Sequence, residues 1–453
     1  MSEQQEAIRN NDSLERLNHA ISSGMFVHVR KMLNDLPAAD VAHILESSIP
    51  KFRLVLWQLI SEEKGGEVLQ YLSEEVRPGI VETMEPHELA AATEGLETDD
   101  LADILGALPE DLYEKVINLL SYRDRQRVEM ALSYPEDTAG GLMNTDTVTI
   151  RPEVTIEVVL RYLRLKGELP ETTDCLFVVD KNDLLVGVVT LANLLINQPS
   201  AIIAEVMSTE FYPFDVEQSA SEVAQVFERR DFISAPVIND VGQLLGRITI
   251  DDAVDVIIDE AEHSIKNLGG LDEEEDTFAP VLATARRRAV WLGVNIVAAV
   301  TAATVSNQFE SVLTEFATIA ILMTIVPSMG GVAGIQSLTL VVRGLALNQI
   351  NKNNQRWLIG KEIMVGVLNG LLWSSTIAIA VAWWKNDMKI GFIIAAAMMI
   401  NLTIACTAGA LIPLVLKRLK IDPSLAGGVI LATITDVVGL ASFLGLATLF
   451  LLL

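Results

Sequence analysis

The stretch at residues 425–453, LAGGVILATITDVVGLASFLGLATLFLLL, contains a single charged residue, Asp436. It is longer than the roughly 20 residues with which an apolar helix crosses a bilayer, so it predicts a membrane-spanning helix. An aspartate at the centre of such a helix costs about 2.5–3.5 kcal/mol, and intramembrane acids usually mark an ion or proton path. Asp436 is therefore the first candidate functional residue.

Four more apolar segments precede this one, at residues 289–306, 313–346, 361–384 and 390–416. Each is close to or above the length that spans a bilayer. Lys and Arg gather at 286–288, 343–361 and 417–420, whereas the alternate loops hold only Lys385 and Lys389. Because basic loops tend to stay in the cytoplasm, residues 286–453 are predicted to form an all-α domain of five transmembrane helices, with the N-terminal domains cytoplasmic and the C-terminus outside.

The charge is divided unevenly along the chain. The first 285 residues hold 54 of the 60 Asp and Glu but only 21 of the 33 Lys and Arg, whereas the remainder is slightly basic. A surface this acidic repels nucleic acid and attracts cations, although simple solubility also explains it. Cys175 and Cys406 lie in different halves, so no disulfide or paired-cysteine metal site is predicted. The N-terminus lacks the apolar core of a signal peptide, so we do not expect export of the first domain.

Residues 60–131 repeat with a period of 12, as in ISEEKGGEVLQY, LETDDLADILGA and LPEDLYEKVINL. Each unit opens on a large apolar residue, followed by Ser, Thr or Pro with acids, which is a pattern that starts a helix. Short helices with one apolar face bury that face only by stacking on their neighbours. Residues 1–132 are therefore predicted to form an all-α superhelical N domain.

Residues 133–262 contain an internal duplication, in which CLFVVDKNDLLVGVVTLANLL (175–195) aligns with SAPVINDVGQLLGRITIDDAV (234–254). Each copy predicts two strands joined by a turn and followed by a helix. The duplication resembles a tandem pair of α/β CBS domains. In that family a Thr and the acid three residues later often hold an adenosine ribose. The matching residues are Thr190 with Asn193 and Thr249 with Asp252, so only the second copy keeps the acid, and ATP binding at the CBS domains is a secondary expectation.

Proline and glycine gather in the second apolar segment, in VPSMGGVAGIQS (326–337). These residues free backbone groups that hydrocarbon cannot satisfy, so we expect the helix to break here and to face protein or a water-filled path. The alternative is that the small residues allow close helix packing.

The charge of Asp436 needs compensation. A proton or hydrogen bonds to Thr433, Thr435 or Asn401 could provide it. A second solution is a twofold homodimer in which two such aspartates share one divalent cation, since twofold dimers are the commonest assemblies. The membrane segments offer oxygen ligands and no thiolate or histidine cluster, which favours a hard cation such as Mg²⁺.

The whole chain resembles the bacterial MgtE family of magnesium transporters. The resemblance rests on YPEDTAGGLM before the CBS pair, on PSMGGVAGIQSLTLVVRGLALNQI and on IDPSLAGGVILATITDVVG. It implies a multidomain homodimer with an N domain (1–132), tandem CBS domains (133–262), a connecting plug-like helix and linker (263–285) and five membrane helices (286–453). It also implies a Mg²⁺ channel along the dimer axis, with Asp436 as the pore aspartate.

By the same resemblance, cytosolic Mg²⁺ closes the channel by filling sites between the N domain, the CBS domains and the connecting helix. The candidate sensors are Asp99, Asp103, Asp231, Asp252, Asp255 and Glu260. The candidate pore-lining residues are Pro327, Gly330, Gly331, Gly334, Gln336 and Asn401. Asp99 and Asp103 lie one helical turn apart and so share a face, although acids at a helix start also complement the helix dipole.

This chain departs from the family pattern at several positions. Val332 replaces an Asn of the GGNxGxQ pattern, and Gly427 and Gly428 stand where some relatives carry Asn-Pro. His263 and Ser264 fall where acids are expected. The departures at 332, 427 and 428 leave the secondary pore ligands and the selectivity among divalent ions open. Those at 263 and 264 predict that one or two sensor sites are weaker or absent.

The function predicted from the sequence is passive Mg²⁺ influx across the inner membrane, closed by cytosolic Mg²⁺. The alternative is a CBS-regulated, proton-coupled transporter of another divalent cation, and a receptor that transports nothing is a further rival. The chain has no GxxxxGK[ST] loop and no Ser/His/Asp or HExxH pattern, so an enzyme is not expected. Membrane lipid and a second copy are the expected partners.

Overall fold

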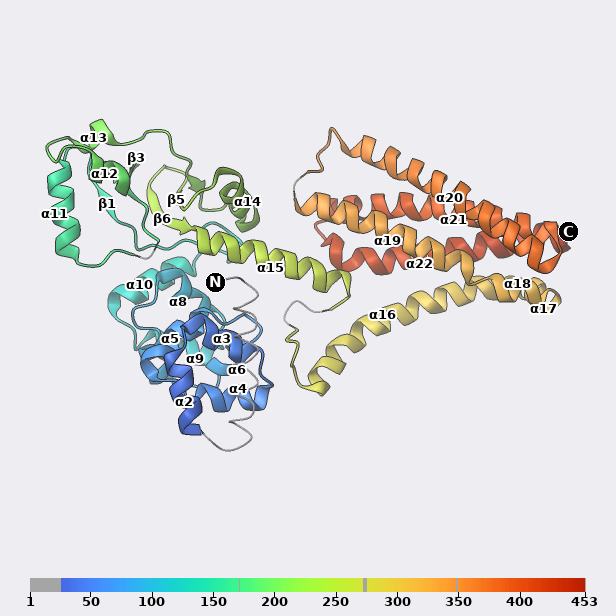
Figure 1. Ribbon diagram of the computed structural model, residues 1–453, viewed down its shortest axis with the longest axis horizontal. Coiled ribbons are helices and arrows are strands. Elements are labelled where there is room, and N and C mark those ends of the chain that lie inside the picture. The colour runs from blue at the N-terminus through green and yellow to red at the C-terminus, as the bar shows by residue number, and fades with distance from the viewer. Residues whose placement is uncertain (1–25, 171, 272–274, 348, 453) are drawn as a thin grey trace. The chain divides into compact units, whose positions relative to one another are not determined.

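The computed structural model describes residues 26–170, 172–271, 275–347 and 349–452 (Figure 1). They divide into two compact units. The first unit comprises the described residues up to 261 together with 275–280, and the second comprises 262–271 together with those from 281 onward.

The first part of the first unit is a stack of short helices. They are α2 (Phe26–Asp35), α3 (Ala38–Glu46), α4 (Pro50–Trp57), α5 (Glu62–Gln70), α6 (Arg77–Val81), α7 (Pro86–Ala92), α8 (Thr98–Gly106), α9 (Glu110–Ile117) and α10 (Tyr122–Ala131). Successive helices mostly begin 12 residues apart, and Pro or Ser stands at most starts. Alternate helices pack together, α5 on α3 and α7, and α8 on α10, around one apolar core. The predicted helical superhelix is confirmed for residues 26–131, and residues 1–25 of the predicted range lie outside the described residues.

Two three-stranded sheets follow. Their elements are β1 (Thr149–Ile150), α11 (Ile156–Lys166), β2 (Cys175–Val179), β3 (Leu185–Thr190), α12 (Leu191–Ile196), α13 (Ile203–Val206), β4 (Phe214–Asp215), α14 (Ala220–Arg230), β5 (Ser234–Ile238), β6 (Leu244–Thr249) and α15 (Ile250–Leu268). In each sheet a parallel pair is followed by an antiparallel pair. The registers are equivalent, because Cys175 pairs with Thr190 as Ser234 pairs with Thr249. The tandem α/β repeat predicted from the sequence is confirmed.

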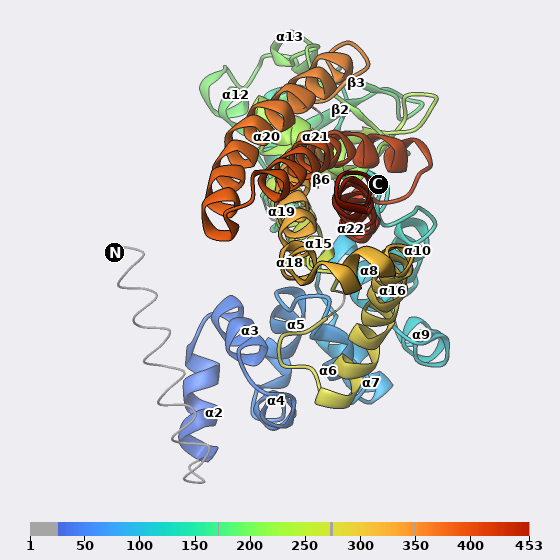
Figure 2. The ribbon, with the colours of Figure 1, turned by 90° about the vertical axis from the view of Figure 1, so that its right-hand side faces the viewer.

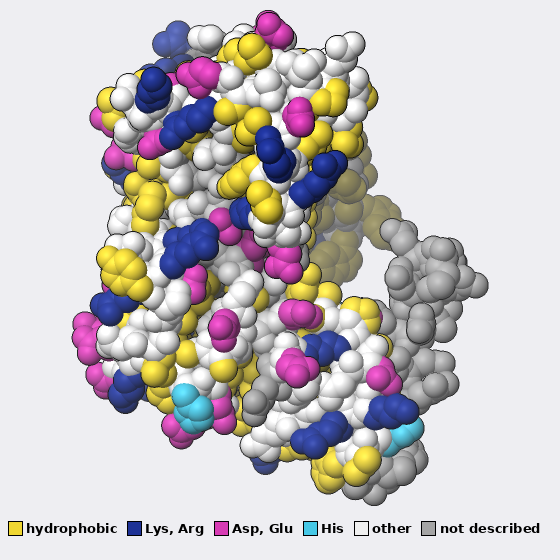
Figure 3. All heavy atoms as spheres, turned by 90° about the vertical axis from the view of Figure 1, so that its left-hand side faces the viewer, with side chains coloured by type: hydrophobic (Ala, Val, Ile, Leu, Met, Phe, Trp, Pro, Cys, Tyr) yellow, Lys and Arg dark blue, Asp and Glu magenta, His cyan; other side chains and the backbone are white. Residues whose placement is uncertain are grey.

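The face drawn in Figure 3, which belongs mainly to the first unit, shows Lys and Arg interspersed with Asp and Glu. The excess of acidic charge in this part of the sequence is therefore not gathered over this face.

The second unit contains long helices (Figure 2). They are rich in apolar residues. Its helices are α16 (Val281–Asn307), α17 (Glu310–Glu315), α18 (Ala317–Leu322), α19 (Ile325–Ala346), α20 (Gln355–Lys385), α21 (Met388–Arg418) and α22 (Pro423–Ala447), which ends in a π-helical turn, η1 (Thr448–Leu452). By length and composition, five spans among the described residues can cross a membrane, at 281–307, 317–346, 355–385, 388–418 and 426–452. α21 packs against α19, α20 and α22, and α16 packs against α22. The prediction of five membrane helices is confirmed.

The predicted break at 326–337 is wrong. α19 runs through this stretch without interruption, and the helix is discontinuous earlier, at Met323 and Thr324. Pro327 lies in the first turn of α19, where the backbone N–H groups have no intrahelical partner, so its ring costs no hydrogen bond.

Gly334 of α19 serves close packing instead, whereas no atom of the described residues lies within 4 Å of a Cβ built on Gly331. A Cβ built on Gly334 would lie 2.9 Å from the side chain of Leu431 on α22. A Cβ on Gly409 of α21 would lie 2.4 Å from the backbone oxygen of Gly334. The alternative explanation, close approach through small residues, accounts for the sequence pattern.

This packing predicts a stability effect. Gly409→Ala should destabilise the protein by about 1–3 kcal/mol, because the new methyl group meets backbone that cannot rotate away. Gly360→Ala is the matched control, since nothing lies within 4 Å of a Cβ there. Heat-induced unfolding in detergent should give a lower midpoint for the first variant only. Equal midpoints would show that the close approach does not matter.

Candidate functional site

The first candidate site lies where acids begin two helices of the first unit. α8 carries Asp99 and Asp100 in its first turn and Asp103 in the next, and α15 carries Asp251 and Asp252 in its first turn. Acids are favourable at helix N-termini because the backbone N–H groups there carry partial positive charge. That local preference explains each pair by itself but does not explain why the pairs meet.

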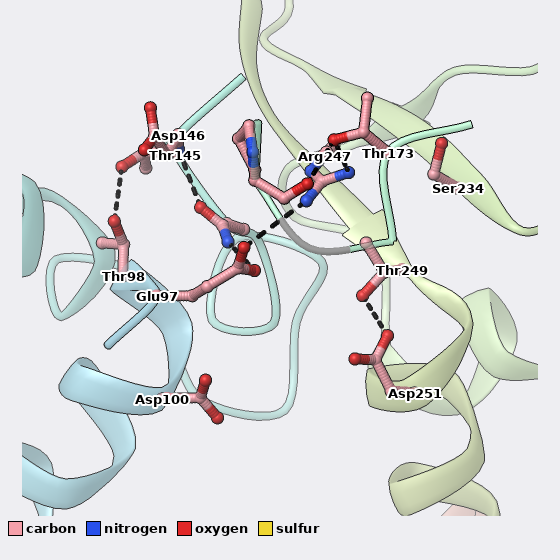
Figure 4. A network of polar contacts seen from close by, with 12 residues as sticks. Glu97, Thr98, Asp100, Thr145, Asp146, Thr173, Ser234, Arg247, Thr249 and Asp251 are labelled. Carbon is pink, nitrogen blue, oxygen red and sulfur yellow. Dashed lines mark hydrogen bonds and ion pairs between the residues drawn. The ribbon is translucent and has the colours of Figure 1, made fainter. Parts of the chain in front are cut away.

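A network of polar contacts joins α8 to the second sheet (Figure 4). Glu97, which precedes α8, accepts a hydrogen bond from the amide of Asn144 and lies 3.7 Å from a guanidinium nitrogen of Arg247 on β6. Thr145 Oγ1 donates to Thr98 Oγ1 at 3.2 Å. Arg247 is buried, and its guanidinium also donates to Thr173 Oγ1. These contacts hold the start of α8 against the segment that leads into α15.

Asp99 is the most unusual carboxylate of the site. Its side chain is buried, and Oδ1 has no hydrogen-bond partner among the described residues. Burial raises the pKa of Asp99 well above its ordinary value, and the neighbouring charges of Asp252, Asp100 and Glu97 raise it further. A buried, unpartnered acceptor surrounded by like charge is a strong point of attraction for a cation.

The surrounding carboxylates are perturbed in the same direction. Burial raises the pKa of Asp252 to about 8, although the Thr249 backbone N–H opposes the change. Burial and then Asp103 raise the pKa of Asp100 to about 7. Desolvation raises the pKa of Asp103 to about 6, against the opposing charge of Arg77.

Arg77 is the cation that opposes these shifts at Asp100, Asp103 and Asp255. The pKa of Asp255 is also raised, first by desolvation and then by Asp251. Two arginines, Arg77 and the Glu97 partner Arg247, face seven carboxylates, which leaves an excess of negative charge that a divalent cation would offset. We name Glu97, Asp99, Asp100, Asp103, Asp251, Asp252 and Asp255 the acidic cluster.

Within the described ranges, no three His, Cys, Asp or Glu side chains converge as ligands of one metal ion. The acidic cluster therefore attracts cations by its charge without presenting a complete set of direct ligands. Mg²⁺ keeps several of its waters and is commonly held by only one or two carboxylates, so the cluster fits such an ion.

The six predicted sensor residues are not all brought together. Asp99, Asp103, Asp252 and Asp255 belong to the acidic cluster. Asp231 instead ends α14 in a left-handed conformation, with φ 54°, and Glu260 is exposed farther along α15. Their predicted role as sensors stays a prediction.

Sequence reasoning missed other members of this site. Asp100 and Asp251 adjoin predicted sensors, so the doubled acids in TDDL (98–101) and IDDAV (250–254) were an available signal. Glu97 and Arg247 lie far apart in the chain, and nothing in their local sequence indicates that they meet.

His263 and Asn267 form a second polar group, at the end of α15. His263 Nε2 lies 2.8 Å from Oδ2 of Asp422, to which the Asn267 amide also donates at 3.0 Å. Asp422 caps the start of α22 by accepting from the backbone of Ser424. Despite partial burial, the Ser424 and His263 hydrogen bonds lower the pKa of Asp422. The histidine that departs from the family pattern thus contacts a carboxylate directly.

The second candidate site is Asp436, which lies midway along α22 and is partly exposed. Its carboxylate has no hydrogen bond or ion pair with any residue that the structure describes. Thr433 and Thr435 donate to the backbone oxygens of Val429 and Ala432, and the Asn401 amide donates to the Val326 oxygen. The hydrogen bonds considered from the sequence as compensation for Asp436 are therefore not formed.

The predicted pore-lining residues differ in exposure. Pro327, Gly330, Gly334 and Asn401 are buried, Gly331 is partly exposed and Gln336 is exposed.

Asn401 of α21 lies against two glycines. A Cβ on Gly330 would lie 2.2 Å from its amide nitrogen and one on Gly439 would lie 2.9 Å away. The amide oxygen of Asn401 has no partner among the described residues. Asn401 therefore sits where α19, α21 and α22 meet, and the role of all six residues in a pore stays a prediction.

Glu362 is a buried acid whose importance the sequence did not reveal. It stands at the edge of the third apolar segment, yet its side chain is buried within the unit. It accepts a hydrogen bond from Ser337 Oγ of α19 at 2.7 Å and lies 3.2 Å from Lys361 Nζ. In the sequence, Glu362 stands at the edge of an apolar segment and therefore resembles a residue at the membrane boundary. Its burial between two membrane helices could not be recognised from that position.

Comparison with known proteins gives consistent matches along the chain. Residues 323–446 match the MgtE family described as a divalent cation transporter, residues 36–137 match the MgtE intracellular N domain, and residues 139–198 and 203–259 match the CBS domain.

Relatives match over nearly the full length. The chain is 31% identical to "Magnesium transporter MgtE" of Thermus thermophilus, over 96% of this chain and 98% of the relative. It is 28% identical to the protein of the same name from Bacillus subtilis, over 95% of both chains.

A solved structure, "Crystal structure of the cytosolic domain of the Mg2+ channel MgtE in complex with ATP", is 33% identical, with a TM-score of 0.50, and covers 54% of this chain and 99% of that one. Since N domain, CBS pair and apolar helices all match in order, the chain is a multi-pass membrane protein and belongs to the MgtE family of divalent cation transporters.

Proposed function

We propose that this protein is a Mg²⁺-selective channel for passive Mg²⁺ influx, which closes when cytosolic Mg²⁺ binds between its N domain and its CBS domains. The observation that carries the proposal is the acidic cluster, and above all the buried, unpartnered Oδ1 of Asp99 beside Asp252. Like charges buried together repel unless a proton or a cation neutralises them. Bound Mg²⁺ would therefore favour the docked arrangement of α8 against α15.

The environment of Asp436 is an argument for an ion-conduction path along α22. Asp436 is partly exposed on α22 and makes no bond within the described part of the chain, so its carboxylate is available to an ion. In a homodimer with α22 beside the twofold axis, two copies of Asp436 would face one hydrated Mg²⁺. Most side chains of α16 are exposed as well, which suits a helix covered by lipid or by the second copy.

The driving force needs no coupled reaction. Moving one elementary charge through 100 mV is worth about 2.3 kcal/mol, so a dication gains about 4.6 kcal/mol from an inside-negative potential of that size. We place the protein in the inner membrane, with its acidic domains in the cytoplasm and its C-terminus outside, because the basic loops alternate along the chain.

ATP is proposed as a second ligand. The cytosolic domain of the similar channel was solved in complex with ATP. In this chain Thr249 Oγ1 and Asp252 Oδ2 lie 2.9 Å apart at the start of α15, so a hydroxyl and a carboxylate stand side by side, as a ribose requires. Isothermal titration with ATP should show binding that Thr249→Val weakens, whereas equal binding would place the nucleotide elsewhere.

The raised pKa values predict how stability depends on pH without Mg²⁺. A carboxyl whose pKa rises on folding binds its proton more tightly in the folded state, so it stabilises at low pH and loses that contribution as pH rises. The stabilising contribution is lost as the pH rises from about 4 to the folded-state pKa of each group, which is about 7 for Asp100 and about 8 for Asp252. Stability should fall by about 1.4 kcal/mol per pH unit for each proton involved.

Thermal unfolding of the full chain in detergent tests this. In the presence of a chelator, the midpoint temperature of unfolding should decrease as the pH is raised from 5.5 to 8. Saturating Mg²⁺ should remove most of this decrease. The double variant Asp100→Asn, Asp252→Asn should show a flatter profile. A midpoint that rises with pH would contradict the electrostatic account.

Flux through reconstituted protein tests the proposed function. Vesicles with an inside-negative potential should take up Mg²⁺ whether or not a pH gradient is present, and Mg²⁺ on the cytoplasmic side should stop the uptake. Flux that collapses with the pH gradient would favour proton-coupled transport, and no flux at all would favour a receptor.

A further inference from the structure

A buried ion pair connects the N domain to the segment that enters the first membrane helix. Arg53 of α4 and Asp276 are 223 residues apart in the sequence, yet they form a two-pronged pair. The distances are 2.7 Å from Nη1 to Oδ2 and 3.3 Å from Nη2 to Oδ1. Both side chains are largely shielded, with 8% and 14% exposed. Both residues belong to the first unit, so this contact lies within one compact body.

Each partner is also held on its own side. Arg53 Nε donates to the Leu45 backbone oxygen at 2.9 Å, and Nη2 donates to the Glu46 oxygen, so the arginine is fixed against the end of α3. Asp276 Oδ1 accepts from the Phe278 backbone N–H at 2.9 Å, which closes a turn in the connecting segment. Although burial acts in the other direction, the hydrogen bonds from Arg53 and Phe278 lower the pKa of Asp276. The carboxylate is therefore charged at neutral pH, as the pair requires.

Asp276 lies close in the chain to the first membrane-spanning helix. α16, the first membrane-spanning helix, begins at Val281, five residues later. Five residues extend at most about 18 Å, so fixing Asp276 limits where α16 can begin. The same N domain carries Asp99, Asp100 and Asp103 on α8.

We propose that Arg53 and Asp276 form a latch through which the N domain restrains the first membrane helix directly, in addition to any signal carried by α15. The inference rests on the proposed gating by cytosolic Mg²⁺. The latch is formed in a structure whose N domain is docked on the second CBS repeat through Glu97 and Arg247, so it belongs to the docked arrangement. Breaking it weakens the coupling between the N domain and α16. Arg53 and Asp276 are positioning residues and touch no transported ion.

Patch recordings on the full chain test the latch. Asp276→Asn removes the charge but keeps an acceptor for the Phe278 N–H, and it leaves the bonds of Arg53 to α3 intact. The internal Mg²⁺ concentration that halves the current should rise about fivefold or more, within the range of ordinary allosteric couplings. Arg53→Gln should give a similar rise, and the double variant should add little to either. Single-channel conductance should not change.

Arg151→Gln is the matched control, since Arg151 forms an exposed pair with Asp183. It should respond to Mg²⁺ as the unchanged protein does. Hydrogen exchange gives a readout that does not depend on gating: Arg53→Gln should speed exchange at Phe278 and Ala279.

The outcomes separate the two ideas. If the unchanged protein does not close with internal Mg²⁺, the proposed function fails, while hydrogen exchange still tests the contact. If the unchanged protein closes and folded Asp276→Asn and Arg53→Gln variants follow the same Mg²⁺ curve, the latch is refuted. Unchanged exchange in Arg53→Gln would also overturn it.

Discussion

Asp436→Ala should abolish Mg²⁺ current while leaving the protein folded. The carboxylate lies midway along α22, is partly exposed and has no bond within the described residues, so its removal leaves no partner unsatisfied. If two copies hold a hydrated cation at the dimer axis, alanine removes both charges that compensate the ion. A loss of even about 4 kcal/mol of ion stabilisation corresponds to roughly a thousandfold lower occupancy.

The measurement is current through reconstituted channels at fixed voltage, with size-exclusion and thermal unfolding as checks on folding. Glu310→Gln is a suitable control, because it neutralises an exposed acid at the start of α17 in the same unit. It should conduct normally. Normal currents in folded Asp436→Ala would remove this residue from the conduction path.

Replacing Asp99, Asp100 and Asp252 together with Asn should leave the channel open at millimolar internal Mg²⁺. Asparagine keeps the size of each side chain but loses the charge that attracts a cation into the acidic cluster. If Mg²⁺ bridges α8 and α15 as proposed, that bridge is then lost, and the current should stop responding to internal Mg²⁺ between micromolar and millimolar concentrations.

A triple change on α9 provides the matched control. Glu110→Gln, Asp111→Asn and Glu114→Gln remove the same number of negative charges from exposed positions. That variant should close with Mg²⁺ as before. Unchanged inhibition of the cluster variant would reject the sensor assignment. A channel closed at every Mg²⁺ concentration would mean that relief of repulsion, rather than bridging by the ion, sets the closed state.

The elements that could be predicted from the sequence are those with a local or periodic signal. The 12-residue repeat predicted the short helices, and the aligned copies at 175–195 and 234–254 predicted the two strands and the following helix of each copy. Length and hydropathy sufficed for the membrane helices. The chain belongs to a family of transporters and is not an enzyme, as its motifs indicated.

The remainder depends on packing between distant segments. Pro327 predicted a break only because its place in the first turn of α19 was not known. Two ion pairs join residues that are far apart in the chain, Glu97 with Arg247 and Arg53 with Asp276. The local sequence around these residues does not predict either contact. The burial of Glu362 follows from the approach of α19 to α20, which hydropathy does not encode.

α15 is one uninterrupted helix from Ile250 to Leu268, about 28 Å long at 1.5 Å per residue. Its first turn carries Asp251 and Asp252, and its last turns carry His263 and Asn267, which hold Asp422 at the start of the helix that contains Asp436. Because a helix without a kink bends little, we expect α15 to move as one rigid element. A tilt of a few degrees at the acidic end would therefore arrive at the opposite tip as a shift of one or two ångströms, on the scale of helix shifts in allosteric transitions.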